Sequence, residues 1–251
     1  VGESVDEPSM YYENNMIQSK IFFDTLVQNN VKKVIFSSTC ATYGSPEIVP
    51  ITEEEKQKPI NPYGWTKLMI EQVLKDYDTA YNLKSIFLRY FNAAGAAYNI
   101  GEDHNPEPHL IPIVLQVALN QREKIKIFGT DFDTRDGTCI RDYIHVIDLA
   151  DAHILALEYL FKENKSNYFN LGTGLGTSVK EIIEVAREIT QHPIPTEEVG
   201  RRAGDPATLI ADSTKAKTIL NWDPKLSVRE VIKSAWEWHF SNPKGFNGST
   251  S

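Results

Sequence analysis

The sequence predicts an α/β protein built on a doubly wound parallel sheet. Short apolar segments rich in β-branched residues alternate with amphipathic segments at helical spacing, which is typical of parallel strands covered by helices. Apolar residues make up 41% and charged residues 24% of the 251 residues, which excludes a disordered, collagen-like or coiled-coil chain. No apolar run reaches the roughly 18 residues of a membrane span, so we expect no membrane partner.

Two helix–strand units open the chain. Apolar residues recur at helical spacing from 9 to 30 and predict a helix that Asn29-Asn30 ends. The apolar, β-branched run over 33–38 predicts a buried strand. After a proline-marked loop, a helix over 61–82 and a strand over 85–90 repeat the arrangement.

The same alternation continues along the rest of the chain and supports a parallel sheet. In chain order, the further predicted segments are a helix over 110–121, strands over 125–128 and 140–145, a helix over 148–162, a strand over 168–171, and helices over 178–190, 213–220 and 227–240. We expect residues 247–251 to form a disordered tail.

The charge and the cysteine content indicate which kinds of partner and which cellular compartment are expected. The chain has 34 acidic and 26 basic side chains, a net charge of −8, and no basic run, so we expect no nucleic-acid partner. Individual arginines can still hold a small anion. Cys40 and Cys139 supply neither a disulfide framework nor a Cys-x-x-Cys pair, which favours a reducing cytoplasm.

Candidate catalytic residues follow the first predicted strand. In a doubly wound sheet, ligands bind at the carboxyl ends of strands, and this strand ends in the hydroxyl-rich run 37–42. About twenty residues later, Tyr63 and Lys67 stand at i and i+4 of a helix and share one face. A nearby ammonium favours phenolate, so we expect Lys67 to lower the pKa of Tyr63 and make it a general base.

Three other segments have simpler interpretations. The segment 104–109 holds two histidines and a glutamate, but its prolines preclude a helix and no metal motif has this form, so we expect no metal ion. The glycine-rich run 172–177 has Thr177 where a dinucleotide fingerprint needs its last glycine, and a turn with Ser178 as helix N-cap fits better. His145 lies in an apolar strand and is expected to be structural.

Several strings together resemble the extended short-chain dehydrogenase/reductase family and, within it, the sugar-nucleotide 4-epimerases. The resemblance covers nearly the whole chain, in addition to the Tyr-x-x-x-Lys pair. In order, the matching strings are Val1-Gly2-Glu3-Ser4, Tyr11-Tyr12-Glu13-Asn14-Asn15, Arg89-Tyr90-Phe91-Asn92, Asp136-Gly137-Thr138, Arg141-Asp142-Tyr143-Ile144-His145-Val146, Asn170-Leu171-Gly172 and Arg201-Arg202-Ala203-Gly204-Asp205.

The resemblance implies NAD-dependent epimerisation at C4 of a UDP-hexose through a transient 4-keto sugar. Tyr63 would be the base, Lys67 would hold the phenolate and the nicotinamide ribose, and Thr39 would supply the hydroxyl, where many relatives carry Ser. Asn14 and Phe91 match positions that contact NAD. The fold would be Rossmann-like, with the NAD-binding part over 1–91 and a smaller UDP-sugar domain over 92–246 whose segments return to the sheet.

The resemblance also implies a UDP-sugar site. Arg141 and Arg202 would bind the diphosphate, because a guanidinium fork suits phosphate oxygens. The other positions that match this site are Asn92, His109, Leu110, Lys126, Ile127, Phe128, Tyr143, Asp205 and Leu209. Leu209 stands where relatives gate the sugar 2-substituent. Leucine is intermediate in size, so we expect UDP-N-acetylglucosamine to be accepted as well.

One family element is missing from the sequence. No Gly-x-x-Gly-x-x-Gly follows an opening strand, and the chain starts at Val1 without an opening strand. We therefore expect the sheet to be incomplete at its N-terminal side. We also expect this polypeptide alone neither to hold NAD tightly nor to turn over substrate.

Alternatives remain at this stage. Sugar-nucleotide dehydratases place acidic residues after the threonine of the hydroxyl strand, whereas Cys40 and Ala41 stand there in this sequence. Two other functions are possible at this point: epimerisation of another UDP-sugar, and non-catalytic binding of a nucleotide sugar. The helices near 9–30 and 61–82 pair across the dimer interface in the family, so we expect a homodimer.

Overall fold

The computed structural model describes residues 2–202 and 204–248. The chain forms two compact units. The first comprises Val1–Phe91, Asp151–Leu171 and Ala211–Asp223. The second comprises Asn92–Ala150, Gly172–Ile210 and Pro224–Ser251.

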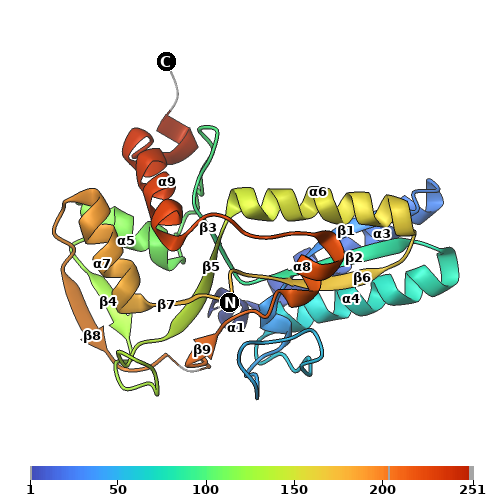
Figure 1. The fold of residues 1–251 in the computed structure, drawn as a ribbon, viewed down its shortest axis with the longest axis horizontal. Coiled ribbons are helices and arrows are strands. Elements are labelled where there is room, and N and C mark those ends of the chain that lie inside the picture. Colours follow the sequence, from blue (N-terminus) through green and yellow to red (C-terminus); the bar gives the residue numbers. More distant parts are fainter. Residues whose placement is uncertain (1, 203, 249–251) are drawn as a thin grey trace. The chain divides into compact units, whose positions relative to one another are not determined.

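The first unit is built on a three-stranded parallel sheet (Figure 1). Its strands are β1 (Lys33–Thr39), β2 (Lys84–Tyr90) and β6 (Asn167–Leu171), in the order β1-β2-β6. The register places Phe36 opposite Phe87, and Leu88 opposite Phe169. Both faces of β2 are buried over most of its length, which explains its nearly continuous apolar sequence.

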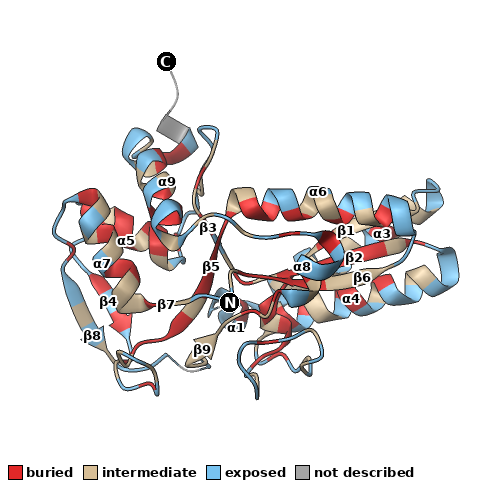
Figure 2. Ribbon diagram, in the orientation of Figure 1, coloured by how far each residue is buried: buried red, intermediate tan, exposed pale blue. Residues whose placement is uncertain are grey.

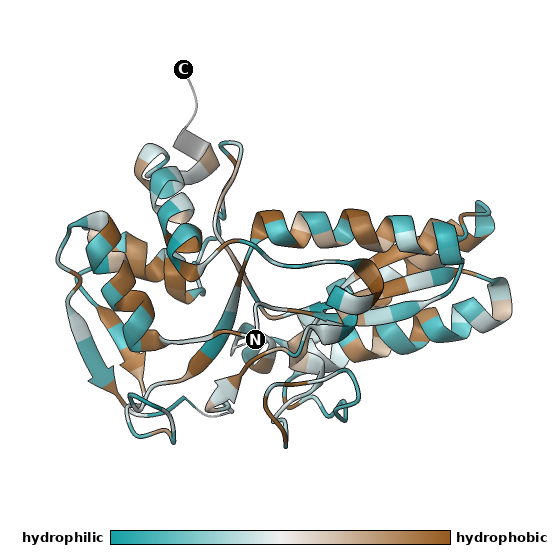
Figure 3. Cartoon of the chain, in the orientation of Figure 1, coloured by the Kyte–Doolittle hydropathy of each residue, from teal (hydrophilic) through white to brown (hydrophobic). Residues whose placement is uncertain are grey.

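Helices cover this sheet on two sides. Figure 1 shows α4 (Pro62–Tyr81) and α6 (Val146–Glu163) on opposite sides of the strands. The side chain of Asn61 caps α4 by accepting a hydrogen bond from the Gly64 N–H at 2.8 Å, and α4 ends at Asn82 in the left-handed conformation. Apolar and polar residues alternate around α6, as Figure 3 shows, and large apolar side chains also lie on its exposed side, namely Ile154, Leu157 and Phe161.

The predicted helix over 9–30 is confirmed, with an irregularity in its middle. It consists of α2 (Pro8–Tyr11), the π-helical segment η1 (Tyr12–Ile17) and α3 (Gln18–Gln28). A short helix, α1 (Gly2–Asp6), precedes it and was not predicted. The other elements of this unit are the 3-10 turn η2 (Cys40–Thr42) and α8 (Thr214–Leu220). Its core is the cluster of Phe23, Phe36, Ile70, Leu74, Leu83 and Phe87.

The second unit has two small sheets. The first orders β3 (Asn92–Ala94), β5 (Ile140–His145) and β7 (Gly176–Ser178), with β9 (Thr208–Leu209) also paired to β5. The second pairs β4 (Ile125–Phe128) in parallel with β8 (Thr196–Val199). The helices are α5 (Leu110–Ala118), α7 (Val179–Thr190), α9 (Val228–Ser241) and the 3-10 turn η3 (Gly245–Gly248). In Figure 2, buried residues line the inner side of α5 and α9, where both helices contribute to one apolar core.

The α/β fold class and every predicted helix and strand are confirmed, with ends displaced by up to three residues. The strands β3, β7 and β9 were not predicted, because runs of two or three residues carry no periodic signal. The strand β8 was not predicted either, because Val199 is its single apolar residue. Among the described residues, the strands form the predicted parallel sheet in the first unit and two smaller sheets in the second unit, one of which is mixed.

Of the expected tail over 247–251, residues 249–251 lie outside the described residues, and 247–248 end the turn η3. Among the helices of the described residues, none is both long enough and apolar enough for a bilayer crossing.

Candidate functional site

The carboxyl end of β1 delivers hydroxyl groups into a fixed turn. Thr39 is the last residue of β1, and its hydroxyl accepts a hydrogen bond from the Ala41 N–H at 3.2 Å. The Thr42 hydroxyl donates to the Thr39 carbonyl at 3.0 Å. These two bonds fix the turn η2, so the position of Thr39 is set by local geometry.

Tyr63 and Lys67 lie in the first turns of α4 and face this strand end. The Lys67 ammonium donates a hydrogen bond to the Ser37 carbonyl at 3.1 Å. The same nitrogen lies 5.8 Å from the centroid of the Tyr63 ring and 5.1 Å from that of Phe36. Lys67 therefore connects α4 to β1 and places its charge beside the phenol ring of Tyr63.

The Tyr63 phenol is hydrogen-bonded to Thr39, and its pKa is raised, whereas the sequence predicted a lowered pKa. Burial raises the pKa of Tyr63 to about 12, although the hydrogen bond with Thr39 lowers it. Burial also lowers the pKa of Lys67. The sequence predicted a lowered tyrosine pKa, and this prediction is wrong, because desolvation of the phenolate outweighs the hydrogen bond with Thr39.

Gly64 permits the close approach of α4 to the loop after β1, and sequence reasoning did not identify it. A Cβ at this position would lie 2.5 Å from the Ala41 carbonyl oxygen and 3.0 Å from the Pro59 Cβ. The helix therefore touches the loop at the residue next to Tyr63. The available signal was a glycine in the first turn of a helix.

A buried charged network lies behind the strand end. The Glu71 carboxylate accepts hydrogen bonds from the Ser38 hydroxyl at 2.6 Å and from Arg89 Nε at 2.9 Å, and a second Arg89 nitrogen lies 2.5 Å from its other oxygen. Arg89 Nη1 also donates to the Tyr43 hydroxyl at 2.9 Å, which donates to Asn170 at 2.7 Å. This network fixes the residue next to Thr39, and the sequence analysis did not predict it.

The other two residues expected at the cofactor lie on different elements of the same unit. Asn14 is exposed on η1, a π-helical segment of the kind often found at functional sites. Its neighbour Asn15 donates to the Thr66 hydroxyl at 3.2 Å, which links η1 to α4. Phe91 is buried directly after β2.

In the second unit, two arginines share one carboxylate. Arg202 Nε donates to Asp205 at 3.0 Å, and an Arg141 nitrogen lies 3.9 Å from the other oxygen of Asp205. The Arg202 guanidinium also lies 5.5 Å from the Phe128 ring centroid. Two positive charges against one negative charge leave a local surplus that suits an anion such as a diphosphate.

The structure separates the remaining candidates for the UDP-sugar site. Strand alternation exposes Lys126 and Phe128 and buries Ile127 in the apolar core, so the Ile127 side chain faces away from the surface. Tyr143 also lies in that core, and burial raises its pKa. The other positions are Asn92, which pairs with Tyr143 across β3 and β5, Leu209, which pairs with Arg141 across β9 and β5, and Leu110, which opens α5.

The histidine candidate of this unit has acidic partners. His109 Nδ1 lies 2.8 Å from a Glu102 carboxylate oxygen and 2.9 Å from one of Glu107. Its hydrogen bonds to these glutamates raise the pKa of His109 to about 9. At neutral pH, His109 is therefore a charged group held by its neighbours.

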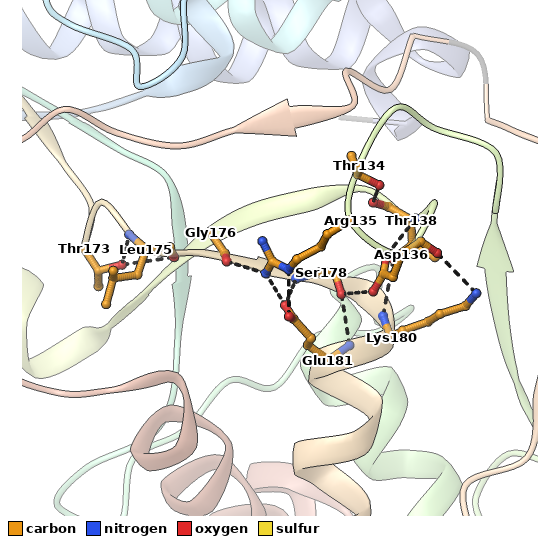
Figure 4. Close-up of polar contacts among 10 residues, drawn as sticks. All are labelled: Thr134, Arg135, Asp136, Thr138, Thr173, Leu175, Gly176, Ser178, Lys180 and Glu181. Atoms are coloured by element: carbon orange, nitrogen blue, oxygen red, sulfur yellow. Dashed lines mark hydrogen bonds and ion pairs between the residues drawn. The ribbon is translucent and has the colours of Figure 1, made fainter.

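The glycine-rich loop 172–177 is a structural turn. Asp142 accepts hydrogen bonds from the backbone N–H groups of Thr173 at 2.8 Å and Gly174 at 3.0 Å, so these donors do not face a phosphate. Figure 4 shows Arg135 bound to the Gly176 carbonyl and to Glu181. The predicted N-cap of α7, Ser178, is confirmed; it forms a capping box with Glu181.

His145 has structural partners. Its Nε2 lies 3.0 Å from the Ser234 hydroxyl, and its Nδ1 accepts from the Ile147 N–H at 3.1 Å. The side chain is buried, and burial lowers its pKa. Both ring nitrogens are engaged within the fold, as expected of a structural histidine.

A parallel sheet with a hydroxyl-bearing strand end, against a helix that begins Tyr63-x-x-x-Lys67, defines the extended short-chain dehydrogenase/reductase class. The family model described as GDP-mannose 4,6 dehydratase matches residues 1–235. A UDP-glucose 4-epimerase of Halalkalibacterium halodurans is 57% identical over 250 residues, which are 98% of this chain and 75% of that protein. The chain belongs to the UDP-glucose 4-epimerase family.

Solved structures agree with this assignment. A crystal structure of a UDP-glucose 4-epimerase superposes with a TM-score of 0.95 at 53% identity, over 98% of this chain and 76% of that one. The UDP-glucose 4-epimerase from Bifidobacterium longum, in complex with NAD+ and UDP, superposes with a TM-score of 0.92 at 41% identity, over 98% of this chain and 75% of that one.

Proposed function

We propose that the protein catalyses NAD-dependent epimerisation at C4 of a UDP-hexose, interconverting UDP-glucose and UDP-galactose through a 4-keto sugar. The observation that carries this proposal is the arrangement of Tyr63, Thr39 and Lys67. The phenol of Tyr63 is hydrogen-bonded to Thr39 and lies beside the Lys67 ammonium. These groups can bind one substrate hydroxyl and accept its proton.

The residues around Tyr63 fit the nicotinamide side of NAD. An ammonium has three hydrogens, and Lys67 donates one of them to Ser37, which leaves donors for ribose hydroxyls. Buried Phe91 and exposed Asn14 would provide an apolar and a polar contact on the same unit. When bound, NAD supplies the acceptor for the hydride from C4.

With a pKa of about 12, Tyr63 is a neutral phenol at neutral pH. To act as a base it must first release its own proton to solvent, and the phenolate then takes the proton of the substrate 4-hydroxyl. Thr39 favours the phenolate through its hydrogen bond, and Lys67 favours it through its charge. The same groups then hold the proton while the keto sugar turns over, so that it can be returned to O4.

The diphosphate is held by Arg141 and Arg202. The Arg141 guanidinium is oriented by the carbonyls of Ile140 and Pro206. Arg202 is oriented by Asp205 and remains exposed and available to a ligand. A firm grip on the nucleotide is required because the sugar must rotate freely between the two hydride transfers. Anchors on the diphosphate meet this demand without restraining the sugar.

Substitution of Tyr63 tests the proposal. In the native NAD-loaded enzyme, Tyr63→Phe should lower kcat for UDP-galactose by about 100- to 10,000-fold, which is the typical contribution of a positioned acid–base group. UDP affinity should be unchanged. Tyr81→Phe, an exposed position on the same helix, is the matched control. Near-wild-type turnover by Tyr63→Phe would overturn the proposed role.

Product analysis distinguishes the epimerase from the other UDP-sugar enzymes. Elimination of water needs an acid and a base after Thr39, where Cys40 and Ala41 stand. We therefore expect UDP-glucose as the product from UDP-galactose, with no 4-keto-6-deoxy sugar and no turnover of GDP-mannose. A deoxy product would identify a dehydratase. Absence of any turnover by the native enzyme with NAD bound would favour a binding module, whereas this polypeptide alone is expected to be inactive in either case.

We infer that the N-acetylated sugar pair is a second substrate. Leu209 lies on β9 beside Arg141, which places a medium-sized side chain next to the proposed diphosphate ligand. Leu209→Tyr should reduce turnover of UDP-N-acetylglucosamine at least tenfold relative to UDP-glucose. Equal ratios in the variant and the parent enzyme would remove Leu209 as a determinant.

We propose that the protein is a cytoplasmic homodimer. Exposed apolar side chains along the 9–30 segment and α4 support self-association; they are Ile17, Ile21, Phe22, Trp65 and Met69. The two cysteines are buried and form no disulfide, which fits a reducing compartment. Light scattering of Phe22→Glu should show a monomer where the parent protein shows a dimer.

A further inference from the structure

The loop before α5 brings two imidazoles and two carboxylates to one point. Each of Glu102, His104, Glu107 and His109 offers one ligand atom, and these atoms lie within 4.8 Å of one another. His109 Nδ1 lies 2.8 Å from Glu102 and 2.9 Å from Glu107. His104 Nδ1 lies 3.2 Å from Glu102 and 3.9 Å from Glu107.

We propose that Glu102, His104, Glu107 and His109 bind one divalent transition-metal ion, with Zn²⁺ as the best fit. Zinc binds imidazole nitrogen and carboxylate oxygen at about 2.0–2.2 Å in a tetrahedron, so ligand atoms lie about 3.4 Å apart. The observed nitrogen–oxygen separations of 2.8 to 3.9 Å bracket this value. The two nitrogens select zinc, cobalt or nickel over magnesium and calcium, which prefer oxygen ligands.

The loop holds these ligands in place before any ion binds. The Glu107 side chain is 2% exposed, and its carboxylate also accepts a hydrogen bond from the His109 N–H at 2.8 Å. Asp103, between two of the ligands, accepts from the Phe246 N–H at 2.9 Å. Pro106 and Pro108 restrict the backbone on both sides of Glu107. Little conformational entropy is therefore lost on binding.

An ion can reach the cluster from solvent. The side chains of His104 and His109 are each 51% exposed, whereas Glu107 closes the inner side. A metal site was not expected in the segment 104–109, because its prolines preclude a helix and no metal motif has this form. In the folded protein, Glu102 adds a second carboxylate from outside this segment. The turn brings all four ligand atoms together without a helix.

Metal titration of the native, tag-free protein tests the proposal. After treatment with a chelator, calorimetric titration with ZnCl₂ should show one ion per chain with a Kd in the micromolar range or tighter. Bound Co²⁺ should give the intense visible absorption of a tetrahedral site. Saturating Zn²⁺ should raise Tm, because an ion that binds only the folded state stabilises it.

Two variants and one control locate the ion. His104→Gln and Glu102→Gln should each weaken Zn²⁺ binding at least tenfold. His192→Gln replaces an exposed histidine outside the cluster and should leave the affinity unchanged. Circular dichroism establishes that each variant is folded, and either cluster variant suffices if the other unfolds.

Three results would overturn the proposal. These are no saturable binding by the parent protein, no loss of affinity in the folded cluster variants, and equal loss in His192→Gln. In each case the cluster is a set of carboxylates neutralised by a protonated His109, without a role for a metal ion. None of these readouts depends on epimerase activity.

Discussion

The Lys67 ammonium donates a hydrogen bond to the backbone carbonyl of Ser37 over 3.1 Å. This bond connects the first turns of α4 to the carboxyl end of β1, two elements separated by the whole proline-marked loop. It holds the ammonium beside the Tyr63 ring while Thr39 contacts the phenol. This contact therefore acts together with the turn η2 and the close approach at Gly64 to fix the geometry of the proposed catalytic group.

Removing this charge should impair chemistry more than nucleotide binding. In the native NAD-loaded enzyme, Lys67→Met should lower kcat at least 100-fold, because the Tyr63 phenolate loses its nearby cation. UDP affinity, measured by calorimetry, should change less than twofold. Lys75→Met, at an exposed position on the same helix, is the control. Equal losses in both variants would argue against a specific role.

Gly64→Ala should destabilise the protein. The new Cβ would lie 2.5 Å from the Ala41 carbonyl oxygen, so either α4 or the loop must move. Such overpacking costs about 1–3 kcal/mol, and urea unfolding measures it. Gly200→Ala is the control, because a Cβ at that position meets nothing within 4 Å. Similar stability of both variants would show that the contact relaxes freely.

Glu71→Gln should destabilise more strongly, because it leaves the Arg89 charge buried without its counter-ion. The paired side chains are 0% and 2% exposed, and breaking a buried pair costs about 3–5 kcal/mol. Glu188→Gln, in the exposed pair with Arg229, should cost at most about 1 kcal/mol. The unfolding free energies of both variants check the prediction, and equal effects would contradict it.

The His109 contacts should make stability depend on pH in a metal-free buffer. Hydrogen bonds to Glu102 and Glu107 raise the pKa of His109 from 6.5 to about 9. Because the pKa is raised in the folded state, protonated His109 stabilises the fold fully below pH 6.5. This stabilisation is lost as the pH rises through about 9. The difference in unfolding free energy between the parent and His109→Gln should therefore shrink between pH 7 and 10.

An imidazole NMR titration checks the same prediction directly. The His109 resonance should titrate near pH 9 in the parent protein and at lower pH in Glu102→Gln, because one of its two carboxylate partners is gone. An unchanged midpoint in the variant would contradict the assigned cause.

The local sequence pattern was sufficient to predict most of the helices and strands, and the Tyr63–Lys67 pair of the site. Helix 61–82 and the strands over 33–38 and 85–90 were predictable because their apolar periodicity extends over enough residues to be unambiguous. The shared face of Tyr63 and Lys67 followed from helical spacing alone. The family resemblance followed from strings that are each specific.

Features that join distant residues had no sequence signal. Glu71 and Arg89 are 18 positions apart, one on a helix and the other on a strand. Glutamate and arginine are usually exposed, so neither residue is predicted to be buried from its type. The clash that reserves position 64 for glycine involves the loop after β1. The strands β3, β7 and β9 exist because β5 offers them hydrogen-bonding partners.

The sequence by itself determined which side chains are available for chemistry, the spacing of Tyr63 and Lys67, and the family. Tertiary structure decided their electrostatic state. The pKa of Tyr63 rises because packing removes water from the phenol, and desolvation depends on neighbours that no local pattern names. The tertiary structure also brings Glu102 and His109 into one cluster, because only the folded turn before α5 places their atoms within hydrogen-bonding distance.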